Sequence, residues 1–190
     1  TVKIFSALFI VVVGGYLAAR FAGQANGIPP GFVSARLQGA LIAQNIVNLS
    51  NQSVSDLEAI SKLDEEGKYI EALNLAVETV TKSRSIRDEA VALSQELEKM
   101  TRALAEIGSA RAREAALESI SSRLALLNRL INYSGYLGEL LDSLRDRFTG
   151  KVPQKSVDIL VGEINQEIAA INALNAQAGQ AMDRFDATIR

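Results

Sequence analysis

The longest stretch of this chain without a strong helix-breaking signal runs from Gly31 to Thr149. Only three prolines occur in 190 residues; two are adjacent, at Pro29 and Pro30, and the third is Pro153. Proline and glycine are the residues that most strongly interrupt helices. So few breaks over such a length predict long helices joined by short turns. We therefore expect the fold class to be all-α.

The clearest periodic pattern lies in the middle of the chain. Apolar residues there step alternately by four and three positions, which is the spacing of a coiled-coil seam: Ile86, Ala90, Leu93, Leu97, Met100, Leu104 and Ile107. Similar spacing elsewhere predicts four body helices, at residues 32–66, 69–106, 109–148 and 153–190. Their near-equal lengths of ~50 to 60 Å fit an antiparallel four-helix bundle or coiled-coil body over residues 32–190.

The turn between the second and third expected helices has the weakest signal. Gly108 can serve as a C-terminal cap and Ser109 as an N-terminal cap. We expect the chain to fold back there. The alternative is one continuous helix over residues 69–148, ~120 Å long.

The third expected helix has two apolar runs, separated by Tyr133, Ser134, Gly135 and Tyr136. We interpret this interruption as a phase shift, with small residues where another helix crosses closely, rather than as a pocket rimmed by two tyrosines. The apolar positions that define the helix are Leu117, Ile120, Leu124, Leu127, Ile131, Leu137, Leu141, Leu144 and Phe148.

The N-terminal segment carries an apolar run whose length suits a lipid bilayer. Residues 4–19 contain no charge and are flanked by Lys3 and Arg20. As a helix, the run up to Ala22 spans ~28 Å, against a hydrocarbon core of ~30 Å. The sequence predicts a single transmembrane anchor over residues 1–23, built on Ile4, Phe5, Leu8, Phe9, Ile10, Val11, Val12, Val13 and Leu17.

The same run also has the layout of a secretory signal peptide, with a small-residue site near Ala25. We expect an uncleaved anchor, and cleavage is the alternative. Residues 24–31 contain the Asn-Gly and Pro-Pro pairs and predict a hinge between anchor and body. Lys3 and Arg20 balance one another, so charge does not fix the membrane orientation. The one apolar run predicts a single-pass membrane protein. The absence of cysteine and the usual behaviour of N-terminal signal anchors favour an extracytoplasmic body.

Composition excludes several kinds of chemistry. The chain has no histidine, cysteine or tryptophan, so it lacks the usual zinc and haem ligands and the residues of a catalytic triad. Its acidic residues fall in ordinary surface patterns. We expect no enzymatic activity, no cofactor and no metal. Twenty basic against 22 acidic residues leave no positive excess for a phosphate backbone, so nucleic acid is not an expected partner.

Two stretches, residues 37–55 and 168–182, contain no charged residue, although 22% of the chain is charged. A helix that faces water on one side normally shows charges within two turns. In an up-down bundle both stretches fall on the same side, so we expect a contact surface there, and a solvated amide-rich face is the alternative. The residues predicted for this contact surface are Ile42, Asn45, Ile46, Leu49, Ile171, Asn172, Asn175 and Ala178.

These features together predict a membrane-anchored, non-enzymatic helical bundle that acts in assembly. It would be a subunit of a surface filament or membrane complex, or a tethered spacer or adaptor, with the lipid bilayer and a protein partner or another copy as its contacts. The alternative is an extracytoplasmic sensory or ligand-binding domain of a truncated receptor-like protein. Its layout is similar to that of the four-helix ligand-binding modules of chemoreceptors.

Overall fold

The computed structural model of this chain describes residues 28–189. The transmembrane anchor expected at residues 1–23 lies outside the described residues, as do residues 24–27 of the expected hinge. None of the helices within 28–189 is long and apolar enough to cross a bilayer. The membrane anchor therefore stays a prediction.

Four long helices make up most of the described chain, and no residue of 28–189 belongs to a strand. They are α2 (Pro30–Glu65), α3 (Tyr69–Ala103), α4 (Ala110–Phe148) and α5 (Val157–Thr188), and a single 3₁₀ turn, η1 (Leu104–Glu106), follows α3. The predicted all-α class and the helical-bundle body are confirmed. The observed bounds agree with the predicted ones to within a few residues.

Short turns reverse the chain between consecutive helices. Gly67, just after α2, and Gly150, just after α4, have φ angles of 71° and 75°, which glycine adopts without strain. Between α3 and α4, the Ser109 hydroxyl accepts a hydrogen bond from the backbone N–H of Ala112 at 3.3 Å. The expected fold-back at Gly108 and Ser109 is therefore confirmed, and the single long helix is wrong.

The start of α5 differs from the prediction. α5 begins at Val157, not at Pro153, because Ser156 is the N-terminal cap. The Ser156 hydroxyl accepts a hydrogen bond from the backbone N–H of Ile159 at 3.3 Å, which satisfies one of the free donors at the helix end. Residues 151–156 form a short link between α4 and α5.

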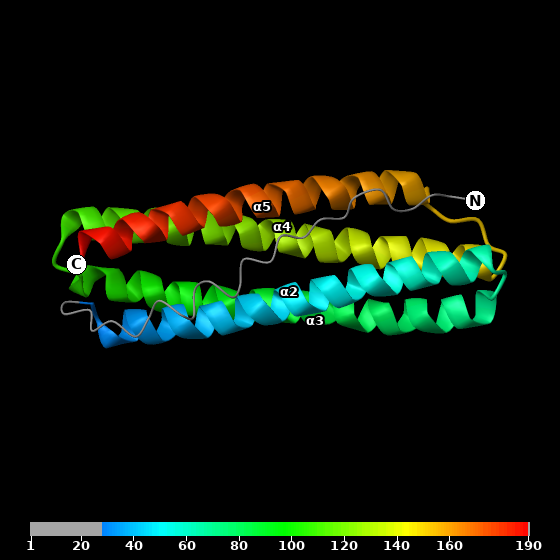
Figure 1. Cartoon of the computed structure of the whole chain (residues 1–190), viewed down its shortest axis with the longest axis horizontal. Coiled ribbons are helices and arrows are strands. Elements are labelled where there is room, and N and C mark those ends of the chain that lie inside the picture. Colours follow the sequence, from blue (N-terminus) through cyan, green and yellow to red (C-terminus); the bar gives the residue numbers. More distant parts are fainter. Residues whose placement is uncertain (1–27, 190) are drawn as a thin grey trace.

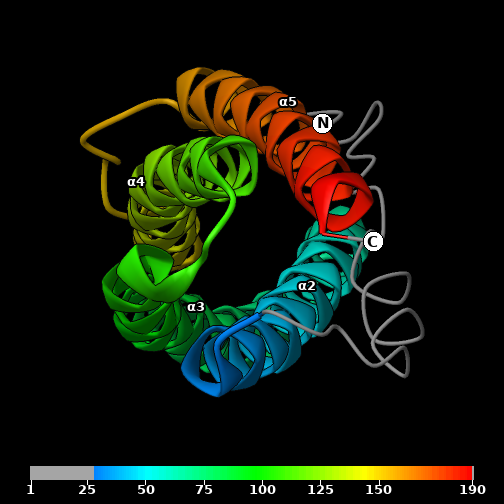
Figure 2. The same ribbon diagram turned by 90° about the vertical axis from the view of Figure 1, so that its left-hand side faces the viewer.

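Helices that follow one another in the sequence pack side by side. α2 lies along α3, α3 along α4 and α4 along α5 (Figure 1). The end-on view shows the four helices arranged in sequence order around the bundle (Figure 2). α2 and α5 complete this ring, yet their backbones make almost no close contact. We call the line along which these two helices face one another the α2–α5 seam, and it is the loosest of the four.

The core follows the predicted spacing in α3. All five of its predicted seam residues are buried: Ile86, Ala90, Leu93, Leu97 and Met100. Ile107, which lies in the turn after η1, is also buried, whereas Leu104 is half-buried. The alternating spacing of four and three therefore identifies the buried face of this helix correctly.

The prediction for the apolar face of α4 is partly wrong. Ile120 and Leu127 are buried, but Leu117, Leu124 and Ile131 are 50%, 44% and 40% exposed. α4 is packed along both α3 and α5, so its broad buried face is centred on other positions. The three exposed residues recur every seven positions and lie at the edge of that face.

Candidate functional site

Two side-chain contacts join α2 to α5 at one end of the α2–α5 seam. The rings of Phe32 and Phe185 lie 5.1 Å apart between centroids. Arg36 donates hydrogen bonds through both terminal nitrogens to the two carboxylate oxygens of Asp186, at 2.7 and 2.8 Å. Bidentate pairs of this kind are stronger and more directional than single hydrogen bonds. These contacts fix the start of α2 against the end of α5.

The two uncharged stretches lie opposite one another across the seam. α2 and α5 run in opposite directions and meet at Phe32 and Phe185 (Figure 1). Residues that follow Phe32 therefore lie beside residues that precede Phe185. Stretch 37–55 of α2 consequently faces stretch 168–182 of α5.

The residues predicted for the contact surface do not all share one surface. Ile46 and Ala178 are buried in the core, and Ile42, Leu49 and Ile171 are partly buried hydrophobic residues packed against it. These five residues therefore serve the packing of the chain's own bundle. The other three are amides: Asn172 and Asn175 are half-buried on α5, and Asn45 is exposed on α2.

Other members of the same stretches form the exposed surface beside the seam. On α2, the residues on one side of Arg36 are buried and those on the other side are exposed, and α5 shows the same division around Asp186. Since both buried flanks point to the core, both exposed flanks share the outer side of the bundle. We call this surface the α2–α5 face; it consists of Leu37, Leu41, Asn48, Ala169, Ala173 and Ala176, all exposed and all uncharged.

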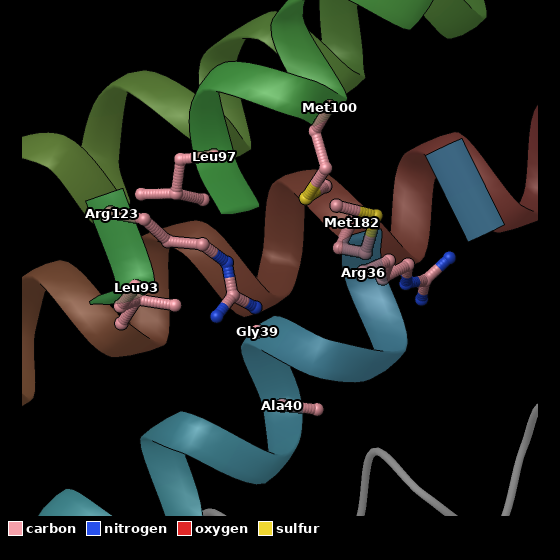
Figure 3. A pocket seen from close by; sticks show the side chains of 8 residues that line it. All are labelled: Arg36, Gly39, Ala40, Leu93, Leu97, Met100, Arg123 and Met182. Carbon is pink, nitrogen blue, oxygen red and sulfur yellow. The ribbon is translucent and has the colours of Figure 1, made fainter. Parts of the chain in front are cut away.

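A pocket lies inside the bundle, behind the seam. Its lining comes from all four helices and is mostly apolar: Arg36, Gly39, Ala40, Leu93, Leu97, Met100, Arg123 and Met182. The cavity measures about 20 Å³, which is room for one or two water molecules. The guanidinium of Arg123 on α4 points into the pocket, whereas that of Arg36 turns away from Arg123 (Figure 3).

Gly39 brings α2 close to α3 at this pocket. A Cβ atom at Gly39 would lie 3.3 Å from Cδ1 of Leu93 and 3.7 Å from Cβ of Glu96. The first distance is tighter than ordinary van der Waals contact, so a larger residue would push Leu93 away. The small residue therefore sets the width of the pocket on its α2 side.

Arg123 is the unusual charge of the pocket. Within the part of the chain that the structure describes, it forms neither a hydrogen bond nor an ion pair. Burial, with a smaller contribution from the positive charge of Arg36, lowers the pKa of Arg123 from 12.5 to about 10. Arg123 therefore remains positively charged at neutral pH, without a counter-charge from residues 28–189.

A second polar cluster joins α4 to α5. Oε1 of Glu167 accepts hydrogen bonds from Arg129 and Asn132, both at 3.4 Å, while its Oε2 is buried and, among the described residues, unpartnered. Oε2 of Glu163 is likewise buried without a described partner. The negative charge of Glu163, followed by burial, raises the pKa of Tyr136. Among residues 28–189, no three metal-ligating side chains gather into one group.

Sequence reasoning missed Arg123, although a signal was present. Arg123 lies seven residues after Ala116 and seven residues before Leu130 in the sequence, and Ala116 and Leu130 are both buried. Burying an arginine in line with core residues costs free energy, because its charge loses contact with water. Its position could therefore have marked it as a candidate binding residue.

No protein-family model, curated protein sequence or solved structure matches this chain. Its class is therefore defined by its own architecture, which is an all-helical bundle of four long helices over the described residues.

Proposed function

We propose that this chain is a membrane-anchored, non-enzymatic helical bundle that assembles with further copies of itself through the α2–α5 face. It would act as a subunit of a surface filament or membrane complex. The predicted anchor at residues 1–23 would hold the copies in one membrane, with the body outside the cytoplasm.

One observation carries this proposal. The two uncharged stretches, 37–55 and 168–182, lie on the two neighbouring helices of the ring that make the least close contact, and their exposed residues share one side of the bundle. Leu37 and Leu41 are 40% and 52% exposed on that side, beside three exposed alanines of α5. Small residues allow a close approach of helices, and apolar side chains stabilise an interface by leaving water.

A second copy is the occupant that best fits a face without charge. When identical surfaces meet, every charged residue risks facing a like charge, which costs free energy. The α2–α5 face contains none. A charged partner, by contrast, would find no complementary charge on this face.

The test is the association of the purified full chain in a nonionic detergent, measured by sedimentation. Ala176→Lys and Leu41→Lys should weaken self-association at least tenfold, because an unpaired charge at an interface costs several kcal/mol. Ala125→Lys is the matched control, since Ala125 is exposed on α4, away from this face.

All three variants should keep the helical signal and nearly the melting temperature of the unaltered chain. If Ala176→Lys and Leu41→Lys associate as the control does, the face is only a solvated surface and the proposal is wrong. Loss of helical structure in Ala176→Lys would mean that this position belongs to the core.

A ligand-binding helical domain of a receptor-like protein is the second candidate function. The pocket at Arg123 favours it, because an interior cavity with a positive charge that no residue of 28–189 pairs is typical of a binding site rather than of a spacer.

A further inference from the structure

Arg123 is a charge that neither the packing nor the proposed assembly of the chain explains. Its guanidinium points into a cavity formed by all four helices (Figure 3). Most of that cavity is lined by leucine, methionine, alanine and glycine. A charge in such surroundings is costly unless something pairs with it.

The chain does not supply the missing negative charge from residues 28–189. The only other charged residue that lines the pocket is Arg36, whose charge is already balanced by both carboxylate oxygens of Asp186. Arg36 also places a second positive charge near Arg123. Counting residues 28–189, the pocket therefore has one positive charge in excess.

We infer that this pocket binds a small monocarboxylate, held by the guanidinium of Arg123. A guanidinium presents parallel N–H donors whose spacing matches the two oxygens of a carboxylate. A ligand with one negative charge would neutralise the one excess positive charge of the pocket. The walls of Leu93, Leu97, Met100 and Met182 suit a short alkyl group and offer nothing to solvate a second negative charge.

The size of the cavity limits the ligand. About 20 Å³ accommodates the two oxygens of formate or acetate. Met100 and Met182 border the cavity, and methionine side chains adapt their shape readily, which leaves room for one more methyl group. A tetrahedral phosphate is larger than acetate, and part of it is doubly charged at pH 7, so this pocket should reject it.

The experiment titrates the full chain in a nonionic detergent at pH 7 with sodium formate or sodium acetate. Sodium fluoride keeps the ionic strength constant, and phosphate serves as a third titrant. The readouts are the Nε–H nuclear magnetic resonance signal of Arg123 and the melting temperature of the helical signal. Formate and acetate should shift the Arg123 signal in a saturable manner and raise the melting temperature, whereas phosphate should do neither.

Two variants and one control localise the effect. Arg123→Met should fold, since it removes an unpaired charge from apolar surroundings, and its melting temperature should no longer respond to acetate. Arg123→Lys keeps the charge but loses the forked donors, so it should bind acetate at least tenfold more weakly. Arg84→Met is the control; Arg84 is exposed on α3 and outside the pocket, and this variant should respond like the unaltered chain.

Three results would overturn the inference. A shift that grows linearly with acetate concentration would show only general salt effects. An equal response in Arg123→Met would place the binding elsewhere. Phosphate bound as tightly as acetate would show that the pocket does not select a monocarboxylate.

Discussion

Ser83 on α3 and Ser134 on α4 bond reciprocally across the interface of their helices. The Ser83 hydroxyl donates to the backbone carbonyl of Ser134 at 2.8 Å, and the Ser134 hydroxyl donates to that of Ser83 at 2.6 Å. Their two hydroxyl oxygens lie 3.1 Å apart. Side chains of this size let the two helices approach closely, so the close crossing predicted around Ser134 is confirmed.

Substituting Ser134 with valine should destabilise the bundle by about 1 to 3 kcal/mol, because it adds bulk to a tight contact and removes the hydroxyl that donates to the Ser83 carbonyl. Urea unfolding followed by circular dichroism measures this change. Ser121→Val is the matched control on the exposed side of α4 and should lie within about 0.5 kcal/mol. Equal effects would argue against the close crossing.

Tyr133 should make the protein sensitive to alkaline pH. Burial raises the pKa of Tyr133, and a hydrogen bond with Ser50 opposes this to a smaller degree. The unfolded chain, whose tyrosines have a pKa of about 10, therefore loses this proton first as the pH rises. The stability that depends on neutral Tyr133 is complete below pH ~10 and decreases above it.

Tyr133→Phe removes this dependence. Between pH 8 and pH 11, the unaltered chain should lose about 1.4 kcal/mol of stability relative to the variant, while all other titrating groups are common to both proteins. Tyr69→Phe, at a residue that is 52% exposed, is the control and should follow the unaltered chain. Parallel curves for the unaltered chain and Tyr133→Phe would contradict the buried position of this hydroxyl.

Two glycines should respond to alanine in opposite directions. Gly67→Ala should cost about 1 kcal/mol, since Gly67 has a φ of 71°, which alanine adopts only with strain. Gly162→Ala should instead stabilise the protein by up to about 1 kcal/mol, because Gly162 is exposed within α5 and a Cβ atom there meets open space. Thermal unfolding measures both, and a stabilising Gly67→Ala would exclude the proposed turn geometry.

Two apolar residues of α3 test which face of this helix is buried. Leu97→Ala should cost about 2 to 5 kcal/mol, because Leu97 is 1% exposed and its removal leaves a cavity. Val91→Ala should lie within about 0.5 kcal/mol, since Val91 is 51% exposed. Chemical unfolding of both variants gives the comparison, and similar losses would mean that the buried face has been misassigned.

Sequence periodicity predicts most of the core, because the buried residues of α3, such as Leu93 and Leu97, recur at the alternating spacing of four and three. It fails for Leu124 because α4 packs along two helices, and a single spacing does not describe so broad a buried face. Sequence reasoning places the start of α5 at Pro153, whereas the helix begins after Ser156, whose hydroxyl caps it. The turn at Gly108 and Ser109 is predicted correctly, because glycine and serine are common capping residues at helix ends.

The candidate sites were less predictable than the fold. Absence of charge identified the two stretches beside the seam, but it did not separate core residues such as Ile46 from exposed residues such as Leu41. Sequence reasoning gives Arg123 no role, because composition alone cannot show where a long side chain ends. Its role depends on three other helices, and their placement is a property of the folded chain.

The loose α2–α5 seam has a consequence for how this protein folds. Every extensive contact joins helices that are consecutive in the sequence, and each pair is connected by a short turn. The loops that must close during folding are therefore short, and the contact order is low, which is typical of domains that fold in microseconds to milliseconds. The hairpin of α2 with α3 and that of α4 with α5 can each form locally, and their docking along α3 and α4 leaves α2 and α5 to meet last.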